Sequence, residues 1–359
     1  MKKLLYIGHA FHNKTKSTQF LKELFKTRYE VTVFDFDPYN DSYEIFSKLK
    51  GLKFDIVILF QIMPPISALK INLSFNLISF FPMYDGVPPI DNPIWREYKE
   101  CNIINFSKTL HKQCKAHGFS SFYIQFFPQP KQVINWGDEH SVFFWQRINV
   151  IPPHIIGKTL NIEEIKTIYL HQVPDPCQNA IDPPAEWKNK VKISTWFDTK
   201  EEMETYMQQA AIYYAPRKYE GIGMSFLDAM ALGRCVIAPD CPTMNEYIQN
   251  GKTGYLYNID NPLMVEPNNI RTMQENSIKF INNGYINWEK RKNLILQWIE
   301  QPPSDNFNLR LFVWAYGKSI IKQLLKKMKK NIKMIIKKTS LFQVYKRCII
   351  NKSFKGRRQ

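Results

Sequence analysis

The sequence predicts an α/β protein of two domains, each built on a mostly parallel sheet with helices on its faces. Short apolar segments typical of buried strands alternate with helical segments from the first residues onward. This alternation pauses in a proline-containing stretch at 127–140 and then starts again. The length of 359 residues also exceeds what one hydrophobic core usually organises.

The elements expected in the first half follow one another in the order of a parallel sheet. They are strands at 2–10, 29–37, 54–61 and 76–85, a helix at 17–27, a strand leading into a helix at 101–118, and a strand with a Pro-rich exit at 121–130. The apolar run at 54–61 is continuous, which is typical of a strand buried on both faces. We therefore expect an N-terminal domain at 1–135.

The same kind of pattern returns in the second half. Its expected strands lie at 141–148, 167–173, 192–197, 212–216 and 234–240, and its expected helices at 201–210 and 223–233. We assign residues 136–304 to a second domain and residues 305–359 to a C-terminal helix and tail. Ligands of such sheets collect beyond the carboxyl ends of the strands, so candidate site residues are sought in the loops that follow them.

The charge is unevenly distributed along the chain. The net charge is +17, yet residues 318–359 hold 15 of the 49 Lys and Arg residues and no Asp or Glu. The remaining chain has 34 basic and 32 acidic residues and is nearly neutral. A hydrophobic content of 44% and an aromatic content of 14% exclude a disordered protein. The sequence thus predicts a neutral globular body with a basic tail.

Cysteine usage and hydropathy favour a cytoplasmic protein. The six cysteines include no CxxC pair, which fits a reducing compartment. The apolar run after Met1 is short and meets Gly8, so it is expected to be a strand and not a signal peptide. No segment approaches the roughly 18 apolar residues that span a bilayer.

A charged, glycine-containing turn precedes a short apolar helix at 217–233, RKYEGIGMSFLDAMALG. Glycines allow a ligand to approach the backbone closely, and a helix N-terminus favours an anion. Arg217 and Lys218 add cationic donors. Taken alone, this pattern is compatible with a phosphate site or with an ordinary tight turn.

The wider segment from Ala215 resembles the C-terminal half of the retaining GT-B glycosyltransferases. This large family includes many bacterial lipopolysaccharide and mannosyl transferases. The resemblance covers some forty residues, with Pro216, the Glu220–Gly223 turn, Asp228, Gly233, the Val-Ile-Ala strand at 236–238, and the Glu246–Gly254 segment. It implies two Rossmann-like domains that face a central cleft.

The resemblance also implies roles for the two acids of the motif, which lie eight residues apart. Glu220 would hold hydroxyls of the donor sugar, and Asp228 would hold the nucleotide ribose. Asp228 stands where the family more often has glutamate and is one methylene shorter. The backbone amides of Gly221, Ile222, Gly223 and Met224 would contact the donor.

The donor diphosphate is expected at the first strand of the second domain, where the family places a Gly-Arg pair followed by a lysine. Arg147 takes the arginine position and Gln146 replaces the glycine. Lys158 is the nearest lysine, and Arg217 or Lys218 are the alternatives to it. Arginine suits this role because its planar fork matches phosphate oxygens.

Two residues of the N-terminal domain complete the expected site. Gly8 ends the first strand, where family members bring backbone close to the donor phosphates, and Asp85 follows the fourth strand, close to the reacting sugar. Asp85 is equally compatible with an ordinary turn before Gly86. The Asp-x-Asp at 35–37 resembles a metal site of another glycosyltransferase fold, but we expect neither metal nor other cofactor.

The basic tail has the pattern of a helix lying on an anionic membrane surface. Apolar residues from Ile321 to Ile336 share one helical face. The opposite face carries Lys322, Lys326, Lys327, Lys329, Lys330, Lys333, Lys337 and Lys338. A helix packed on the globular body is the alternative. Nucleic acid is not an expected partner, because aromatic and Arg residues are missing from this helix.

Together these features predict a retaining, metal-independent glycosyltransferase, peripheral on the inner face of the cell membrane. It would move a sugar from a nucleotide-diphosphate sugar to a hydroxyl of a membrane-held glycan or glycolipid of the lipopolysaccharide, O-antigen or capsule type. Two alternatives remain open at this point. One is an epimerase or phosphorylase of the same fold, and the other is a non-enzymatic binding protein.

Overall fold

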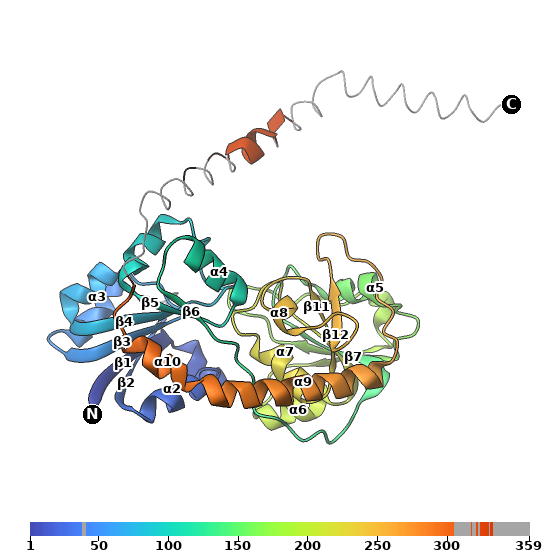
Figure 1. The fold of residues 1–359 in the computed structure, drawn as a ribbon. Helices are drawn as coiled ribbons and strands as arrows, with labels where there is room; N and C mark the ends of the chain where they lie inside the picture. The colour runs from blue at the N-terminus through green and yellow to red at the C-terminus, as the bar shows by residue number, and fades with distance from the viewer. Residues whose placement is uncertain (38–40, 305–316, 318–320, 322–323, 330, 333–359) are drawn as a thin grey trace.

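The computed structural model describes residues 1–37, 41–304, 317, 321, 324–329 and 331–332, and it contains two α/β units side by side (Figure 1). Within the described residues each unit has one six-stranded sheet. Every strand pair is parallel. The predicted two-unit α/β fold is therefore confirmed.

The N-terminal sheet has the strand order β2-β1-β3-β4-β5-β6. Its strands are β1 (Lys2–His9), β2 (Tyr29–Phe36), β3 (Lys53–Phe60), β4 (Ser74–Phe81), β5 (Asn102–Asn105) and β6 (Ser121–Tyr123). The helical segments are α1 (Phe11–Thr15), α2 (Gln19–Lys26), η1 (Tyr43–Leu49), α3 (Ile66–Asn72), η2 (Pro93–Glu100) and α4 (Lys108–Ala116). Strand β3 is buried over most of its length, as its continuous apolar run predicts.

The C-terminal sheet has the strand order β12-β11-β10-β7-β8-β9. Its strands are β7 (Asp138–Gln146), β8 (Thr167–Gln172), β9 (Val191–Ser194), β10 (Ala210–Tyr214), β11 (Cys235–Pro239) and β12 (Gly254–Tyr257). The helical segments are η3 (Pro153–Ile155), α5 (Ile156–Thr159), η4 (Ala185–Trp187), α6 (Lys200–Met207), α7 (Met224–Ala231), α8 (Met244–Tyr247), α9 (Ile270–Arg291) and α10 (Asn293–Ile299). The sequence analysis does not predict α9 or α10.

One hydrophobic cluster continues from one unit into the other, so the two units share part of their core. Phe127 lies in the connection and packs against Tyr247 and Phe280 with ring centroids 5.4 Å apart in both pairs. A Cβ atom on Gly284 of α9 would come within 2.2 Å of the Phe127 ring. Glycine at 284 is therefore what lets α9 pass this close to the connection.

A buried arginine ties the connection to the second unit. Arg234 is fully buried, and its guanidinium donates hydrogen bonds to the carbonyls of Leu232, Gln208, Ala210 and Asn135 at 2.6–3.2 Å. Burial lowers its pKa to about 10. Asn135 belongs to the connection, so this side chain fixes the point where the chain enters β7.

The last fully described helices return to the first unit. Helix α9 passes along the second unit and leads to α10, which lies against the N-terminal sheet (Figure 1). Trp298 stacks on Phe122 with ring centroids 5.4 Å apart. Glu300 accepts hydrogen bonds from Tyr29 at 2.8 Å and from Arg28 at 2.7 Å. The two units are thus joined by the connection and by this returning segment.

Part of the basic tail is described. Residues 324–329 are helical, with Leu324, Leu325 and Met328 each more than half exposed. Lys326, Lys327 and Lys329 are exposed as well. The predicted membrane residues Lys322, Lys330, Lys333, Lys337 and Lys338 lie outside the described residues. In the part of the chain that is described, no helix combines the length and apolarity needed to cross a membrane.

Candidate active site

The turn between β10 and α7 is shaped by two glycines. Gly223 caps α7 in a left-handed conformation with φ of 82°, and a Cβ atom there would lie 1.9 Å from the Phe226 ring. At Gly221, a Cβ atom would lie 2.7 Å from Met83 and 2.9 Å from an Asp85 carboxylate oxygen. Both positions need glycine, and Gly221 allows this turn to meet the loop that follows β4 in the other unit.

Charged side chains from both units meet at this contact, and we call them the Arg217 cluster: Asp85, Arg147, Asp175, Arg217 and Glu220. Arg217 donates to an oxygen of Asp85 at 2.8 Å and to one of Asp175. Arg147 donates to the other oxygen of Asp175 through Nε at 2.8 Å and Nη2 at 2.7 Å. Each residue follows the carboxyl end of a strand, as expected for a ligand site of parallel sheets.

Burial shifts the proton affinities in this cluster. Loss of solvent raises the pKa of Glu220 to about 7, with Arg217 opposing the shift and Asp85 adding to it. Burial also raises the pKa of Asp85 above its ordinary value, although Arg217 opposes this. Burial alone would lower the pKa of Arg217, but Glu220, Asp85 and Asp175 raise it. Arg217 therefore remains a cation among acids, one of which titrates near neutral pH.

The raised pKa of Glu220 predicts that stability falls as the pH rises. The folded protein holds this proton more tightly than the unfolded chain, whose glutamate has the ordinary pKa of 4.5. Glu220 thus contributes stability that is complete below pH 4.5 and is lost as the pH rises to about 7. Urea unfolding at about pH 5 and about pH 8 should show a smaller loss of stability for Glu220→Gln than for the unchanged chain. An equal loss in both proteins would show that Glu220 is not the source of this pH dependence.

Asp228 lies in α7 and is paired with two lysines. Its carboxylate oxygens lie 2.7 Å from Lys200 Nζ and 3.2 Å from Lys131 Nζ. Lys131 also pairs with Glu204. The side chain of Asp228 is 8% exposed. The second acid of the motif is therefore already compensated by two cations, neither of which the sequence analysis singles out.

One hydrogen bond joins the segment after β1 to Gln61, which follows β3. Gly8 ends β1, and its absent side chain leaves room for the Tyr6 ring, 2.8 Å from where a Cβ atom would stand. His12 lies in the short helix α1 that follows, with Nε2 2.6 Å from Gln61 Oε1. Gln61 in turn lies against Gly86, next to Asp85. Burial lowers the pKa of His12 to about 4, so this imidazole is neutral at pH 7.

The two lysines considered for the diphosphate, unlike Arg147 and Arg217, are not members of the Arg217 cluster. Lys158 is exposed on α5, and among the described residues it makes no ion pair. Lys218 lies 3.7 Å from Asp260 and above the Tyr219 ring, at the edge of the Arg217 cluster. Ile222 is buried beside the turn, and Met224 opens α7. Of the predicted cations, the structure thus brings Arg147 and Arg217 together.

Asp175 is the member of the cluster that sequence reasoning misses. It is the acceptor that joins the two arginines, and its backbone N–H donates to the carbonyl of Arg147 at 2.9 Å. A loop acid after the expected strand at 167–173 is the only signal for it, and many loop acids share that position. In the described residues, no group of three or more His, Cys, Asp or Glu side chains is arranged to hold a metal ion.

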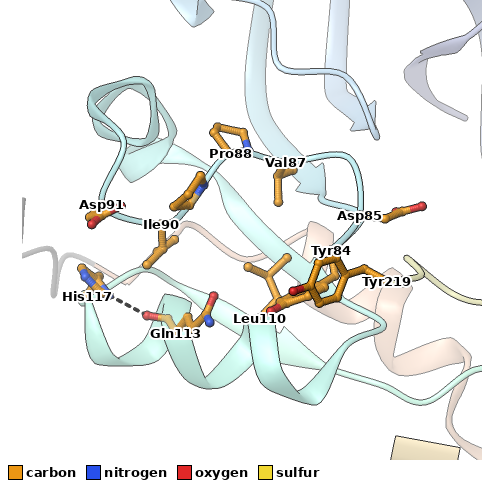
Figure 2. Close-up of a pocket in the computed structure, with 11 residues that line it drawn as sticks. Tyr84, Asp85, Val87, Pro88, Ile90, Asp91, Leu110, Gln113, His117 and Tyr219 are labelled. Carbon is orange, nitrogen blue, oxygen red and sulfur yellow. Dashed lines mark hydrogen bonds between the residues drawn. The ribbon is translucent and has the colours of Figure 1, made fainter. Parts of the chain in front are cut away.

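A pocket of about 480 Å³ lies beside the cluster, between the loop after β4, helix α4 and the turn after β10. Figure 2 shows Tyr84, Leu110, Tyr219 and Ile90 grouped around it. The Asp85 side chain points away from these residues. Because its carboxylate contacts Arg217, Asp85 belongs both to the Arg217 cluster and to the lining of the pocket.

Glu246, from the matched motif, joins the second unit to helix α4 of the first. Its carboxylate accepts hydrogen bonds from the backbone N–H groups of Lys108 at 2.6 Å and Thr109 at 2.9 Å. It also accepts from the hydroxyls of Ser107 at 3.1 Å and Thr109 at 2.7 Å. A carboxylate here satisfies the open donors of the helix N-terminus and complements its dipole.

Replacing Glu246 with glutamine is expected to lower the free energy of unfolding by about 1–2 kcal/mol, because an amide accepts fewer of these bonds. Urea unfolding measures the change. The control is Glu275→Gln, because among the described residues Glu275 forms an ion pair with Arg271 alone and both side chains are 47% exposed. The control should cost less than about 0.5 kcal/mol. Equal effects of the two variants would show that Glu246 does not link the units.

The chain is similar to known proteins both in sequence and in fold. Residues 163–283 match the family model described as "Glycosyl transferases group 1". This stretch contains Asp175, Arg217, Glu220, Asp228 and Glu246. No protein among those with curated functions matches the chain.

Three solved structures have a similar fold. The apo form of the lipopolysaccharide outer core galactosyltransferase WaaB has a TM-score of 0.50 and 15% identity, covering 89% of this chain and 99% of that one. Sucrose-phosphate synthase from Thermosynechococcus elongatus has a TM-score of 0.54 and 13% identity, with coverages of 91% and 100%. Anabaena HepE in complex with UDP and glucose has a TM-score of 0.50 and 13% identity, covering 82% of this chain and 99% of that one. The GT-B fold and the resemblance to group 1 glycosyltransferases are confirmed.

Proposed function

We propose that this GT-B chain, whose residues 163–283 match the group 1 glycosyltransferases, is a retaining glycosyltransferase. It would move a sugar from a nucleotide-diphosphate sugar to a hydroxyl of a membrane-held glycan or glycolipid. One observation carries the proposal. Two arginines and three carboxylates from the loops of both units converge at a glycine-shaped turn before a helix.

Each side chain of the cluster has a task in this proposal. Arg147 and Arg217 would bind the diphosphate, whose oxygens compete with Asp175 and Asp85 for the same guanidinium donors. Glu220, in its ionised form, would accept hydrogen bonds from two adjacent hydroxyls of the donor sugar. Asp228 would accept from the ribose, with Lys131 and Lys200 holding its carboxylate in place.

The transfer step would take place at the face of the sugar that the diphosphate leaves. The bond from the anomeric carbon to the phosphate oxygen breaks, and the acceptor oxygen forms the new bond on the same side. The acceptor proton passes to the departing phosphate. Negative charge that grows on the leaving group would be stabilised by Arg147 and Arg217, so the proposal needs no metal ion.

The described part of the tail supports a peripheral position on the inner face of the membrane. Exposed apolar residues at 321, 324, 325, 328 and 332 accompany exposed lysines at 326, 327 and 329. Sedimentation of the full chain with vesicles of anionic or neutral lipid tests this part. Equal binding to both vesicles, or binding to neither, would count against membrane attachment.

A thermal-shift screen with UDP-, GDP-, dTDP- and ADP-sugars tests the donor side. A ligand at about 100 times its Kd should add about 2.7 kcal/mol to the stability. A sugar transferred from the selected donor to a second glycoside would then separate a transferase from an epimerase or phosphorylase. If no nucleotide sugar stabilises the chain at millimolar concentration, the proposal fails.

A further inference from the structure

The pocket beside the Arg217 cluster is built from both units. The loop after β4 contributes Tyr84 and Ile90, α4 contributes Leu110 and Gln113, and the turn after β10 contributes Tyr219. Its volume of about 480 Å³ lies within the range of small-molecule sites. A ligand in it would therefore contact the donor-side turn and the first unit at the same time.

The walls of the pocket combine two aromatic rings and aliphatic side chains with a few polar groups. Tyr84 and Tyr219 meet edge to face, with ring centroids 5.6 Å apart and an interplanar angle of 70°. Asp91 and His117 lie at the opposite end from the two rings and Asp85 (Figure 2), and the Gln113 side chain hydrogen-bonds to Tyr84. Such a pocket fits a ligand that presents C–H groups on one face and hydroxyls at its rim, which is the chemistry of a pyranose.

The charges of the lining favour a neutral ligand. The lining residues include Asp91 and Asp85, whose carboxylate faces Arg217, and no Lys or Arg is among them. Arg217, which is nearby, already donates to Asp85 and Asp175. An acidic sugar or a phosphate would therefore enter a site with negative groups and no dedicated cation, which costs free energy in a partly buried place.

The position of Asp85 links the pocket to the chemistry. Its backbone lies in the pocket wall, while its carboxylate contacts Arg217 and lies next to Gly221. A sugar against Tyr84 and Tyr219 would thus have a hydroxyl beside Asp85, at the boundary with the donor site.

We propose that this pocket binds the terminal, uncharged pyranose of the acceptor glycan, with Tyr84 and Tyr219 against its apolar face and Asp91 and Gln113 at its hydroxyls. This inference rests on the transferase function proposed above and specifies the acceptor class. Tyr219 precedes Glu220 in the donor turn. The acceptor pocket is therefore completed by the same turn that holds the donor.

Saturation-transfer NMR on the full chain with UDP tests the pocket. The probes are methyl α-D-glucopyranoside and methyl α-D-galactopyranoside, with methyl glucuronide as the acidic probe and uridine as an aromatic one. At least one neutral glycoside should bind, and the glucuronide should bind at least about tenfold more weakly. Preference for the glucuronide or uridine, or failure of both neutral probes, would overturn the inference.

Two variants locate the bound glycoside. Gln113→Trp places a large side chain in the pocket, and the matched control Lys112→Trp alters the exposed neighbour on the same helix. The glycoside Kd should rise at least about tenfold in Gln113→Trp and stay within about twofold in Lys112→Trp. Tyr219→Ala should weaken glycoside binding more than Tyr219→Phe. This pair of variants tests the pocket even if Gln113→Trp fails to fold.

The nucleotide-induced thermal shift separates this inference from the proposed function. If nucleotide still stabilises the variants but glycoside binding is unchanged in Gln113→Trp and Tyr219→Ala, the pocket assignment alone is wrong. If nucleotide sugars do not stabilise the unchanged chain, the transferase proposal fails first.

Discussion

Replacing Glu220 with alanine is expected to reduce kcat/KM for sugar transfer by about 10²-fold or more. The carboxylate lies at the turn after β10, is 8% exposed and feels the charges of Arg217, Arg147, Asp85 and Asp175. In the proposed role it accepts hydrogen bonds from donor hydroxyls. Its removal would leave those hydroxyls and Arg217 without this partner in a place that water reaches poorly.

A transfer assay with the donor found by thermal shift measures this loss. Glu186→Gln is the control, because Glu186 is an exposed glutamate of the same unit and lies outside the Arg217 cluster. Circular dichroism and the melting temperature show whether Glu220→Ala keeps its fold. Transfer at the original rate by a folded Glu220→Ala protein would contradict the role of Glu220 and favour a binding protein without transferase activity.

Replacing Arg217 with alanine is expected to lower the free energy of unfolding by about 3 kcal/mol or more. Arg217 is the cation between Asp85 of the first unit and Asp175 of the second. Without it, these acids and Glu220 would repel one another across the contact between the units. Breaking a buried ion pair from one side is costly because the remaining charge has no compensation.

Urea unfolding checks this prediction, with Lys218→Ala as the neighbouring control. Lys218 lies 3.7 Å from Asp260, whose side chain is 87% exposed, so its ion pair should add less than about 1 kcal/mol. Arg217→Ala should also lose the nucleotide-induced thermal shift. A stability loss as small as that of Lys218→Ala would show that Arg217 does not hold the two units together.

Local patterns predict β1 to β11 because each is a short apolar run bounded by turn residues, but β12 is not among the expected strands. The continuous run at 54–61 becomes β3, and the run at 212–216 becomes β10. The helices α9 and α10 are missed, although together they cover residues 270–299. Their apolar faces are shared between two units, so the sequence pattern does not show one simple stripe.

The residues of the candidate site also fall into two groups, those that a local pattern reveals and those that it does not. Glu220, Asp228 and the glycines stand in one contiguous motif, so a single sequence is enough to point to them. Asp175 gains its role from Arg147 and Arg217, which lie 28 and 42 residues away in the chain. Tyr219 gains its role from Tyr84, which it contacts from a distant part of the sequence. No spacing rule in the chain relates such positions, and sequence reasoning could not rank them.

The sequence by itself determined the two α/β units, the glycine-containing motif after Ala215 and the basic tail, because each is encoded by residues close together in the chain. Only the tertiary structure decided that Asp175 joins the two arginines, that Glu246 caps α4 across the units, and that Tyr84 and Tyr219 border one pocket. These contacts depend on how the two sheets are placed against each other. That placement follows from the packing of Phe127, Gly284 and α10, which no local pattern contains.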